Sequence, residues 1–180
     1  MQRHILTGAP GSGKTAILRR LELDGLAVVE EAATDVMALE LARGVVRPWT
    51  DPGFIDRIVA LQRERRRRAT ADVQVHDRSP VCTAALALFL DVPVPAALAR
   101  ELDEIERGAI YRREVFFVGN QGFVTPTEAR RISLAEALRF ERVHREAYLT
   151  RGFRLIEVAP GPLEERAAAV RVGIGAPRSS

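Results

Sequence analysis

The segment GAPGSGKT, residues 8–15, decides the fold of this chain and matches the pattern G-x-x-x-x-G-K-[ST] at every defined position. A short apolar stretch, residues 4–7, precedes it, and a stretch of helical character, residues 15–21, follows it. We therefore predict a strand, a tight turn and a helix. Backbone N–H groups of such a turn point inward, and the helix adds the positive end of its dipole, so the segment predicts a phosphate-binding loop.

The side chains of this loop have separate expected roles. Lys14 should reach the β- and γ-phosphates of a nucleotide, and the hydroxyl of Thr15 should bind Mg²⁺. The glycines let the backbone come close to the phosphates. The residues expected to contact the nucleotide here are Gly8, Pro10, Gly11, Ser12, Gly13, Lys14 and Thr15.

The alternative is a glycine-rich turn that happens to contain a lysine. The chain has 27 Lys and Arg residues, and Lys14 is its only lysine. A chain that otherwise uses arginine has its one compact ammonium where such a group must reach a phosphate. This composition favours the nucleotide-binding interpretation.

Length and composition predict one domain, residues 1–175, followed by a disordered tail, residues 176–180. The chain has 180 residues, of which 47% are hydrophobic and 28% charged. No apolar run approaches the length of a membrane helix, and the N-terminus enters a strand with no room for a signal peptide. Cys82 is the only cysteine, which excludes an internal disulfide and a thiolate metal cluster. We expect a cytoplasmic protein.

The net charge of +3 is mild evidence for an anionic ligand and weak evidence for nucleic acid.

Apolar segments typical of strands alternate with segments of helical periodicity along the chain. This alternation predicts an α/β domain in which a parallel sheet carries helices on both faces. Asp51-Pro52 and Ser79-Pro80 each resemble a cap followed by a first-turn proline, and Ser133 to Glu136 is a capping box. The expected strands are residues 4–7, 26–29, 73–77, 115–118 and 155–158, and the expected helices are residues 15–21, 33–44, 52–68, 80–89, 96–107, 133–150 and from 162 onward.

Carboxylates follow two of the expected strands. Asp77 ends the strand at residues 73–77, where it is a natural Mg²⁺ partner of the Walker B type. The alternative is that Asp77 pairs with Arg78 or caps the next helix. Glu30 and Glu31 follow another strand, where one carboxylate could accept a proton from a substrate hydroxyl. Because adjacent strand residues point opposite ways, only one of them can face the cleft, and the alternative is that both are surface acids.

Arginines are the candidates for stabilising charge on a transferred phosphoryl group. Arg78 follows Asp77 directly, and Arg130 and Arg131 end a glycine-containing segment, residues 119–131, that we expect to act as a lid. Four consecutive arginines, residues 65–68, cover most of a helix circumference, so some should face solvent and some could line the ligand cleft.

These motifs come in an order that resembles the small AAA-labelled P-loop ATPase family related to bacterial nicotinamide riboside kinase domains. The Asp-Arg-Ser step is also similar to the motif of deoxynucleoside and thymidylate kinases. The resemblance spans about residues 4 to 172. It rests on residues 8–15, residues 28–33, Phe54 with Gln62 and Glu64, Asp77-Arg78-Ser79 and Arg131.

The resemblance implies a nucleoside-kinase-like P-loop NTPase fold with strand order 2-3-1-4-5. It also implies that Glu31 holds the acidic position after the second strand, that Arg78 lies near the phosphates and that Arg131 belongs to the lid. Lys14 and Asp77 complete the expected catalytic set. Relatives often carry arginine where this chain has Thr34. If that arginine contacts the acceptor, the resemblance implies that the acceptor differs here or that transfer has been lost.

The leading hypothesis is a Mg²⁺- and ATP-dependent phosphotransferase acting on a small, nucleoside-like hydroxyl acceptor. Its alternative is a regulatory ATPase or GTPase switch that answers to a protein partner. Nucleic acid is not expected, because no aromatic-interleaved basic stripe is present. The single lysine excludes an Asn-Lys-x-Asp base motif, which favours ATP over GTP.

Overall fold

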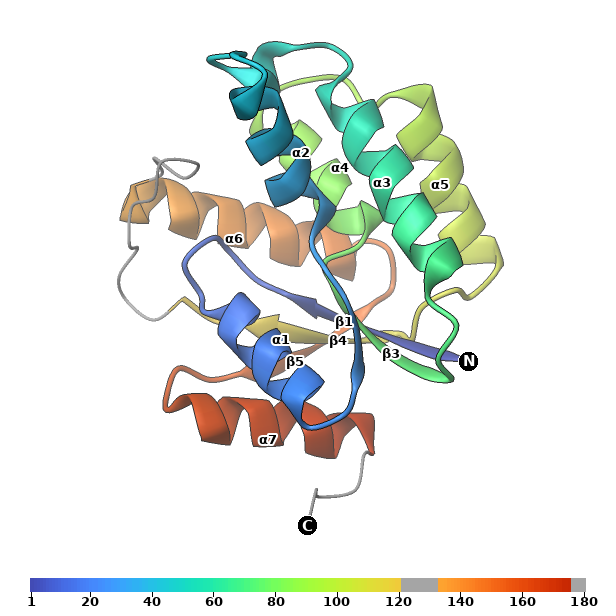
Figure 1. The fold of residues 1–180 in the computed structure, drawn as a ribbon, viewed down its shortest axis with the longest axis vertical. Helices are drawn as coiled ribbons and strands as arrows, with labels where there is room; N and C mark the ends of the chain where they lie inside the picture. Colours follow the sequence, from blue (N-terminus) through green and yellow to red (C-terminus); the bar gives the residue numbers. More distant parts are fainter. Residues whose placement is uncertain (121–132, 176–180) are drawn as a thin grey trace.

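The computed structural model describes residues 1–120 and 133–175, and its centre is a five-stranded parallel sheet (Figure 1). The strand order is β2-β3-β1-β4-β5, with each neighbouring pair parallel. This is the predicted 2-3-1-4-5 topology, and it places β1, which leads into the phosphate loop, at the centre. The strands are β1 (Gln2–Thr7), β2 (Ala27–Val29), β3 (Val73–Asp77), β4 (Glu114–Val118) and β5 (Arg154–Val158).

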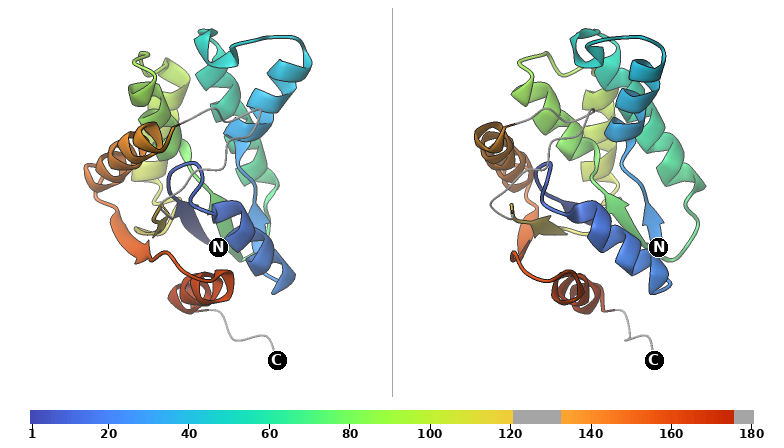
Figure 2. Two further views of the ribbon diagram at one scale, coloured as in Figure 1. Left: turned by 90° about the vertical axis from the view of Figure 1, so that its left-hand side faces the viewer. Right: turned by 60° about the vertical axis from the view of Figure 1, so that its left-hand side comes forward.

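Helices cover both faces of the sheet. Figures 1 and 2 show α1 and α7 together on one side, and the remaining helices on the other. Ile5 and Leu6, adjacent on β1, pack into two different buried clusters, because successive strand side chains point to opposite faces. The helices are α1 (Lys14–Leu23), α2 (Ala32–Ala42), η1 (Pro48–Thr50), α3 (Phe54–Arg68), α4 (Pro80–Phe89), α5 (Ala96–Arg107), α6 (Leu134–Leu149) and α7 (Leu163–Ile174).

Two of the three predicted helix starts are confirmed. Ser79 accepts a hydrogen bond from the Val81 amide at 3.2 Å, with Pro80 in the first turn. Ser133 and Glu136 form both bonds of the capping box.

The cap predicted at Asp51 is wrong. The carboxylate of Asp51 accepts from the Gly53 amide at 2.6 Å and closes a local turn, and α3 begins only at Phe54. An aspartate that bonds two residues ahead stabilises a turn rather than a helix end, and sequence alone does not separate the two.

Two further predictions concern the segment before α6 and the membrane. Most of the predicted lid, with Arg130 and Arg131, lies outside the described residues. Among the residues that the structure describes, no helix is long and apolar enough to cross a bilayer.

Candidate active site

The phosphate loop connects β1 to α1 through backbone conformations that only glycine adopts readily. Gly8 has a φ of 145°, and a Cβ atom there would lie 2.3 Å from the Val118 carbonyl oxygen. Gly13 has a φ of 83° immediately before α1 begins at Lys14. The N-terminal end of α1 therefore points into the loop, which is the arrangement that binds phosphate groups.

Two buried cations contact carbonyl groups of the loop. The Lys14 ammonium donates to the Ala9 carbonyl at 3.2 Å, so it lies across the loop. Arg166, on α7, donates to the Ser12 carbonyl at 2.9 Å. Because C=O and N–H point opposite ways across a trans peptide, this bond turns the Gly13 amide away from α7. Arg166 is absent from the predicted site, since only the fold brings residue 166 beneath residue 12.

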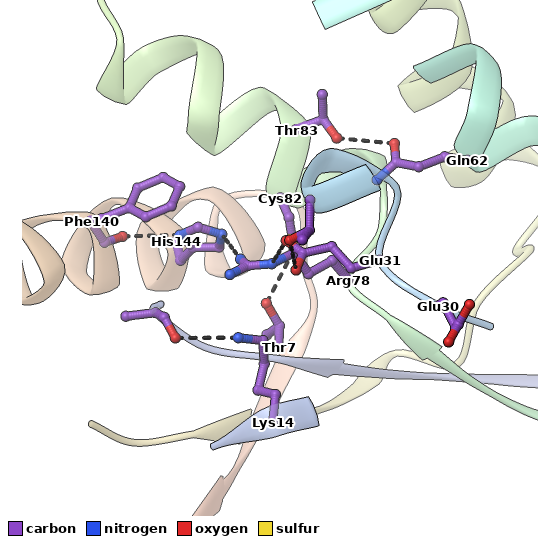
Figure 3. Close-up of polar contacts among 12 residues, drawn as sticks. Thr7, Lys14, Glu30, Glu31, Gln62, Arg78, Cys82, Thr83, Phe140 and His144 are labelled. Carbon is purple, nitrogen blue, oxygen red and sulfur yellow. Dashed lines mark hydrogen bonds and ion pairs between the residues drawn. The ribbon is translucent and has the colours of Figure 1, made fainter. Parts of the chain in front are cut away.

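The adjacent acids after β2 lie in different surroundings, which Figure 3 shows. The side chain of Glu30 is 52% exposed and forms an ion pair with Arg19. The side chain of Glu31 is 14% exposed, and its carboxylate lies 2.6 Å from Nε of Arg78. Thr34 donates to the other oxygen of Glu31 at 2.8 Å. Glu31 is therefore held in place at the carboxyl edge of the sheet, and Glu30 points to the surface.

Arg78 connects β3 to α4 in the left-handed region, with a φ of 70°, and its side chain is buried. Its amide donates to the Leu6 carbonyl at 3.0 Å, and its guanidinium lies 2.8 Å from Nε2 of His144. Burial by itself would lower the pKa of Arg78, but the Glu31 carboxylate holds the pKa above its ordinary value. Arg78 is therefore a permanent cation between a carboxylate and an imidazole.

His144 on α6 is a neutral acceptor in this chain of contacts. Its Nδ1 lies 3.0 Å from the Phe140 carbonyl, so Nδ1 carries the proton and Nε2 accepts from Arg78. Burial, reinforced by the charge of Arg78, holds the pKa of His144 well below its usual range. The sequence shows a single histidine on a mostly apolar helix face, and nothing in that pattern indicates this role.

A large cavity of about 750 Å³ opens beside this chain of contacts. It lies between α2, η1, α3, α4 and α6, and it reaches the phosphate loop at Pro10. Most of the lining side chains are apolar, and the polar ones include Glu31 and Arg78. The lining residues are Pro10, Glu31, Ala33, Thr34, Met37, Leu41, Val46, Arg47, Trp49, Phe54, Gln62, Arg78, Cys82, Thr83, Leu86, Phe89, Leu90, Glu136 and Phe140.

A smaller cavity of about 250 Å³ lies on the other side of Glu31 and contains the two predicted Mg²⁺ ligands, Thr15 and Asp77. Glu31 and Thr34 line both cavities. Among the described residues, no group of three or more His, Cys, Asp and Glu side chains is arranged to hold a metal ion. A hydroxyl and a carboxylate fit Mg²⁺ that is bound mainly through substrate phosphates, because this ion retains few protein ligands in such sites.

The four consecutive arginines at the end of α3, some of which could have lined the ligand cleft, line neither of the two cavities. Arg65 pairs with Asp35, and Arg66 is buried against Glu101 at 2.7 Å. Arg67 and Arg68 are exposed beside Glu64. Arg65 also donates to the Glu31 carbonyl at 2.7 Å, so it supports the backbone behind the site, while the other three pair with acids on α3 and α5.

The fold, the loop and the acids at the sheet edge define a P-loop nucleotide-binding protein. A family model described as an AAA domain matches residues 3–166, and the chain belongs to this family, as its motifs predict. Among curated protein sequences, none matches this chain significantly.

Solved structures show the same fold. One is the crystal structure of NadR protein in complex with NAD and AMP-PNP, which aligns with a TM-score of 0.67 at 16% sequence identity. The alignment covers 99% of this chain and 51% of that chain, so this protein spans about half the length of NadR. At this identity the likeness establishes the P-loop NTPase fold.

Proposed function

We propose that this protein is a Mg²⁺- and ATP-dependent phosphotransferase whose acceptor is a small hydroxyl-bearing molecule. The observation that carries the proposal is the place of Glu31, which lines both the large cavity and the smaller one that contains Thr15 and Asp77. A carboxylate between a phosphate site and a cavity is where a base must act if a phosphoryl group passes from one ligand to the other. The adenine nucleotide in the NadR complex supports ATP as the donor.

The nucleotide half of the site uses the loop amides, Lys14 and Thr15. The loop amides and the ammonium of Lys14 would neutralise the β- and γ-phosphates, since both converge on one concave surface. Thr15 and Asp77 would hold Mg²⁺, which supplies further charge neutralisation at the phosphates when bound. By holding ATP and the acceptor next to each other, the site would raise the rate of phosphoryl transfer through positioning of the two reactants.

The acceptor half uses Glu31, Arg78 and Thr34. The acceptor's hydroxyl oxygen attacks the γ-phosphorus, a new P–O bond forms, and the bond from the γ-phosphorus to its bridging oxygen breaks as ADP leaves. The Glu31 carboxylate takes the proton of the hydroxyl. Arg78 orients that carboxylate at 2.6 Å, and His144 in turn fixes Arg78. Arg78 is thus a positioning residue for the base.

The test is acceptor-dependent release of ADP from ATP by the purified protein. We expect at least one small alcohol in a screened panel to raise ADP release in a saturable way, in the presence of Mg²⁺. A basal rate that no small molecule changes, but that a protein partner does change, would contradict the proposal and favour the switch hypothesis.

A further inference from the structure

The large cavity is polarised along its length by the helices that form it. Both α2 and α4 begin at the carboxyl edge of the sheet and run away from it (Figure 1). Thr34 and Leu41 on α2 are seven residues apart, as are Cys82 and Phe89 on α4. At 1.5 Å per residue, each pair spans about 10 Å. The cavity therefore has an inner end at the sheet edge and an outer end about 10 Å away.

The inner end carries the hydrogen-bonding groups. Glu31 and Arg78 lie there with Thr34, next to the phosphate loop. Thr83 also lies at the inner end, because it is close to the start of α4. Gln62 lies beside it, since the two side chains are hydrogen-bonded. These polar side chains come from several elements and converge on one end of a mostly apolar cavity.

The outer end is apolar and aromatic. Its lining includes Leu41 near the end of α2, Phe89 at the end of α4, Trp49 in η1 and Phe54 at the start of α3. The charged side chains there are engaged: Arg47 lies over the Trp49 ring at 5.9 Å, and the carboxylate of Glu136 accepts from Ser133 in the capping box. In the part of the chain that the structure describes, this end offers few partners for the hydroxyl groups of a sugar.

Gln62 has a fixed orientation at the inner end. Its amide oxygen accepts from the Thr83 hydroxyl at 3.0 Å, so the amide nitrogen points away from Thr83 (Figure 3). That nitrogen has two N–H donors, and the bond from Thr83 to the amide oxygen leaves them directed elsewhere in the cavity wall. An oriented donor in a cavity wall favours a ligand that places an acceptor oxygen, such as a carbonyl, opposite it.

We infer that the acceptor is an alcohol with an apolar, largely aromatic body of about 10 Å and one hydrogen-bond acceptor near its hydroxyl, not a polyhydroxylated nucleoside. The inference rests on the proposed function, because that function places the reacting hydroxyl at Glu31. A sugar lying in the apolar part of the cavity would leave its hydroxyls desolvated and unpaired, whereas an aryl group would bury apolar area there.

Binding of simple probes tests this inference. Trp49 is the only tryptophan, so its emission reports on the outer end of the cavity. Biphenylylethanol, added to the protein with Mg²⁺ and a non-hydrolysable ATP analogue, should change this emission in a saturable way. It should also bind at least about tenfold more tightly than uridine, which is the factor expected when buried apolar area replaces unpaired hydroxyls.

Matched variants locate the two ends of the ligand. Leu41→Gln should weaken biphenylylethanol binding about tenfold, and Leu39→Gln, which changes an exposed residue of the same helix outside the cavity, should not. Hydroxyacetylbiphenyl differs from biphenylylethanol by a carbonyl in place of a methylene, and calorimetry should show that it binds more tightly. Gln62→Leu should remove that difference. Thermal unfolding verifies that each variant is folded.

The outcomes separate this inference from the phosphotransferase proposal. Uridine binding as tightly as biphenylylethanol, or equal effects of Leu41→Gln and Leu39→Gln, would overturn the acceptor class and leave phosphoryl transfer to another alcohol standing. Tight, Leu41-dependent binding of biphenylylethanol supports the acceptor class. ADP release that neither this probe nor any other alcohol stimulates would count against phosphoryl transfer itself.

Discussion

The phosphate loop and the large cavity meet at Pro10, but they are built in different ways. The loop is eight consecutive residues, 8–15, whose backbone conformation and N–H groups form the binding surface. The cavity is assembled from side chains of five separate elements, and each contributes only a few residues. A surface made of backbone tolerates little change and keeps its sequence pattern, whereas a surface made of side chains can change its ligand by substitution. Thr34 belongs to the side-chain surface and lines both cavities.

The largest expected effect tests the residue that lies between the two regions. Glu31→Gln keeps the size of the side chain but removes its basicity, so phosphoryl transfer should fall by about 10²- to 10⁴-fold while nucleotide affinity hardly changes. Steady-state transfer rates and calorimetric titration with ATP measure the two quantities. Glu30→Gln is the matched control, because that carboxylate is half exposed, pairs with Arg19 and, unlike Glu31, does not line the large cavity. A larger loss of phosphoryl transfer in Glu30→Gln than in Glu31→Gln would show that Glu31 is not the base.

The next effect belongs to the loop alone. Lys14→Ala removes the ammonium that would contact the phosphates, and charged hydrogen bonds contribute about 1.5–3 kcal/mol each, so ATP affinity should fall by about 100-fold. Thermal unfolding without nucleotide should show a folded protein. ATP affinity like that of the wild type would show that the loop does not bind the nucleotide in the proposed way.

A smaller effect should come from the support beneath the loop. Arg166→Met removes the bond to the Ser12 carbonyl, and one charge-assisted bond corresponds to about a tenfold loss of ATP affinity. Arg171→Met is the control on the same helix, because Arg171 pairs with Asp24, away from the loop. Equal losses of ATP affinity in both variants would mean that Arg166 acts by holding α7 in place and not by orienting the loop.

The last effect is on stability and not on activity, and it concerns the cavity side of the site in acid. Because the folded pKa of His144 lies well below 6.5, the unfolded chain binds a proton that the folded chain excludes as the pH falls below 6.5. The contribution of His144 to the free energy of unfolding is therefore at its maximum above that pH. It decreases below that pH, by at most about 1.4 kcal/mol per pH unit. Denaturant unfolding of His144→Gln, whose amide can replace both bonds, should depend less on pH between 6.5 and 5 than that of the wild type. An unchanged pH dependence would contradict the neutral state of His144. The other two histidines, His4 and His76, also have lowered pKa values, mainly because they are buried, and contribute acid sensitivity of the same sign.

The two regions also differ in how far sequence predicts them. Alternating strands and helices were enough to predict the parallel sheet, and one glycine-rich motif was enough to predict the loop, because both depend on local pattern. The sheet order came from the resemblance to nicotinamide riboside kinase domains. Arg166 and His144 were not predictable, since each meets its partner only through tertiary packing. The false cap at Asp51 shows the limit of local rules, because the same side chain closes a turn as readily as a helix end.

The central claim is that a phosphoryl group passes from the loop to a ligand in the cavity, across Glu31. The most direct measurement follows ATP radiolabelled at its γ-phosphate, incubated with Mg²⁺, the protein and biphenylylethanol or a pool of small alcohols. We predict that the label moves to an organic molecule with wild-type and Glu30→Gln protein and fails to move with Glu31→Gln. Label that appears only as inorganic phosphate, at equal rates in all three proteins, would contradict the account.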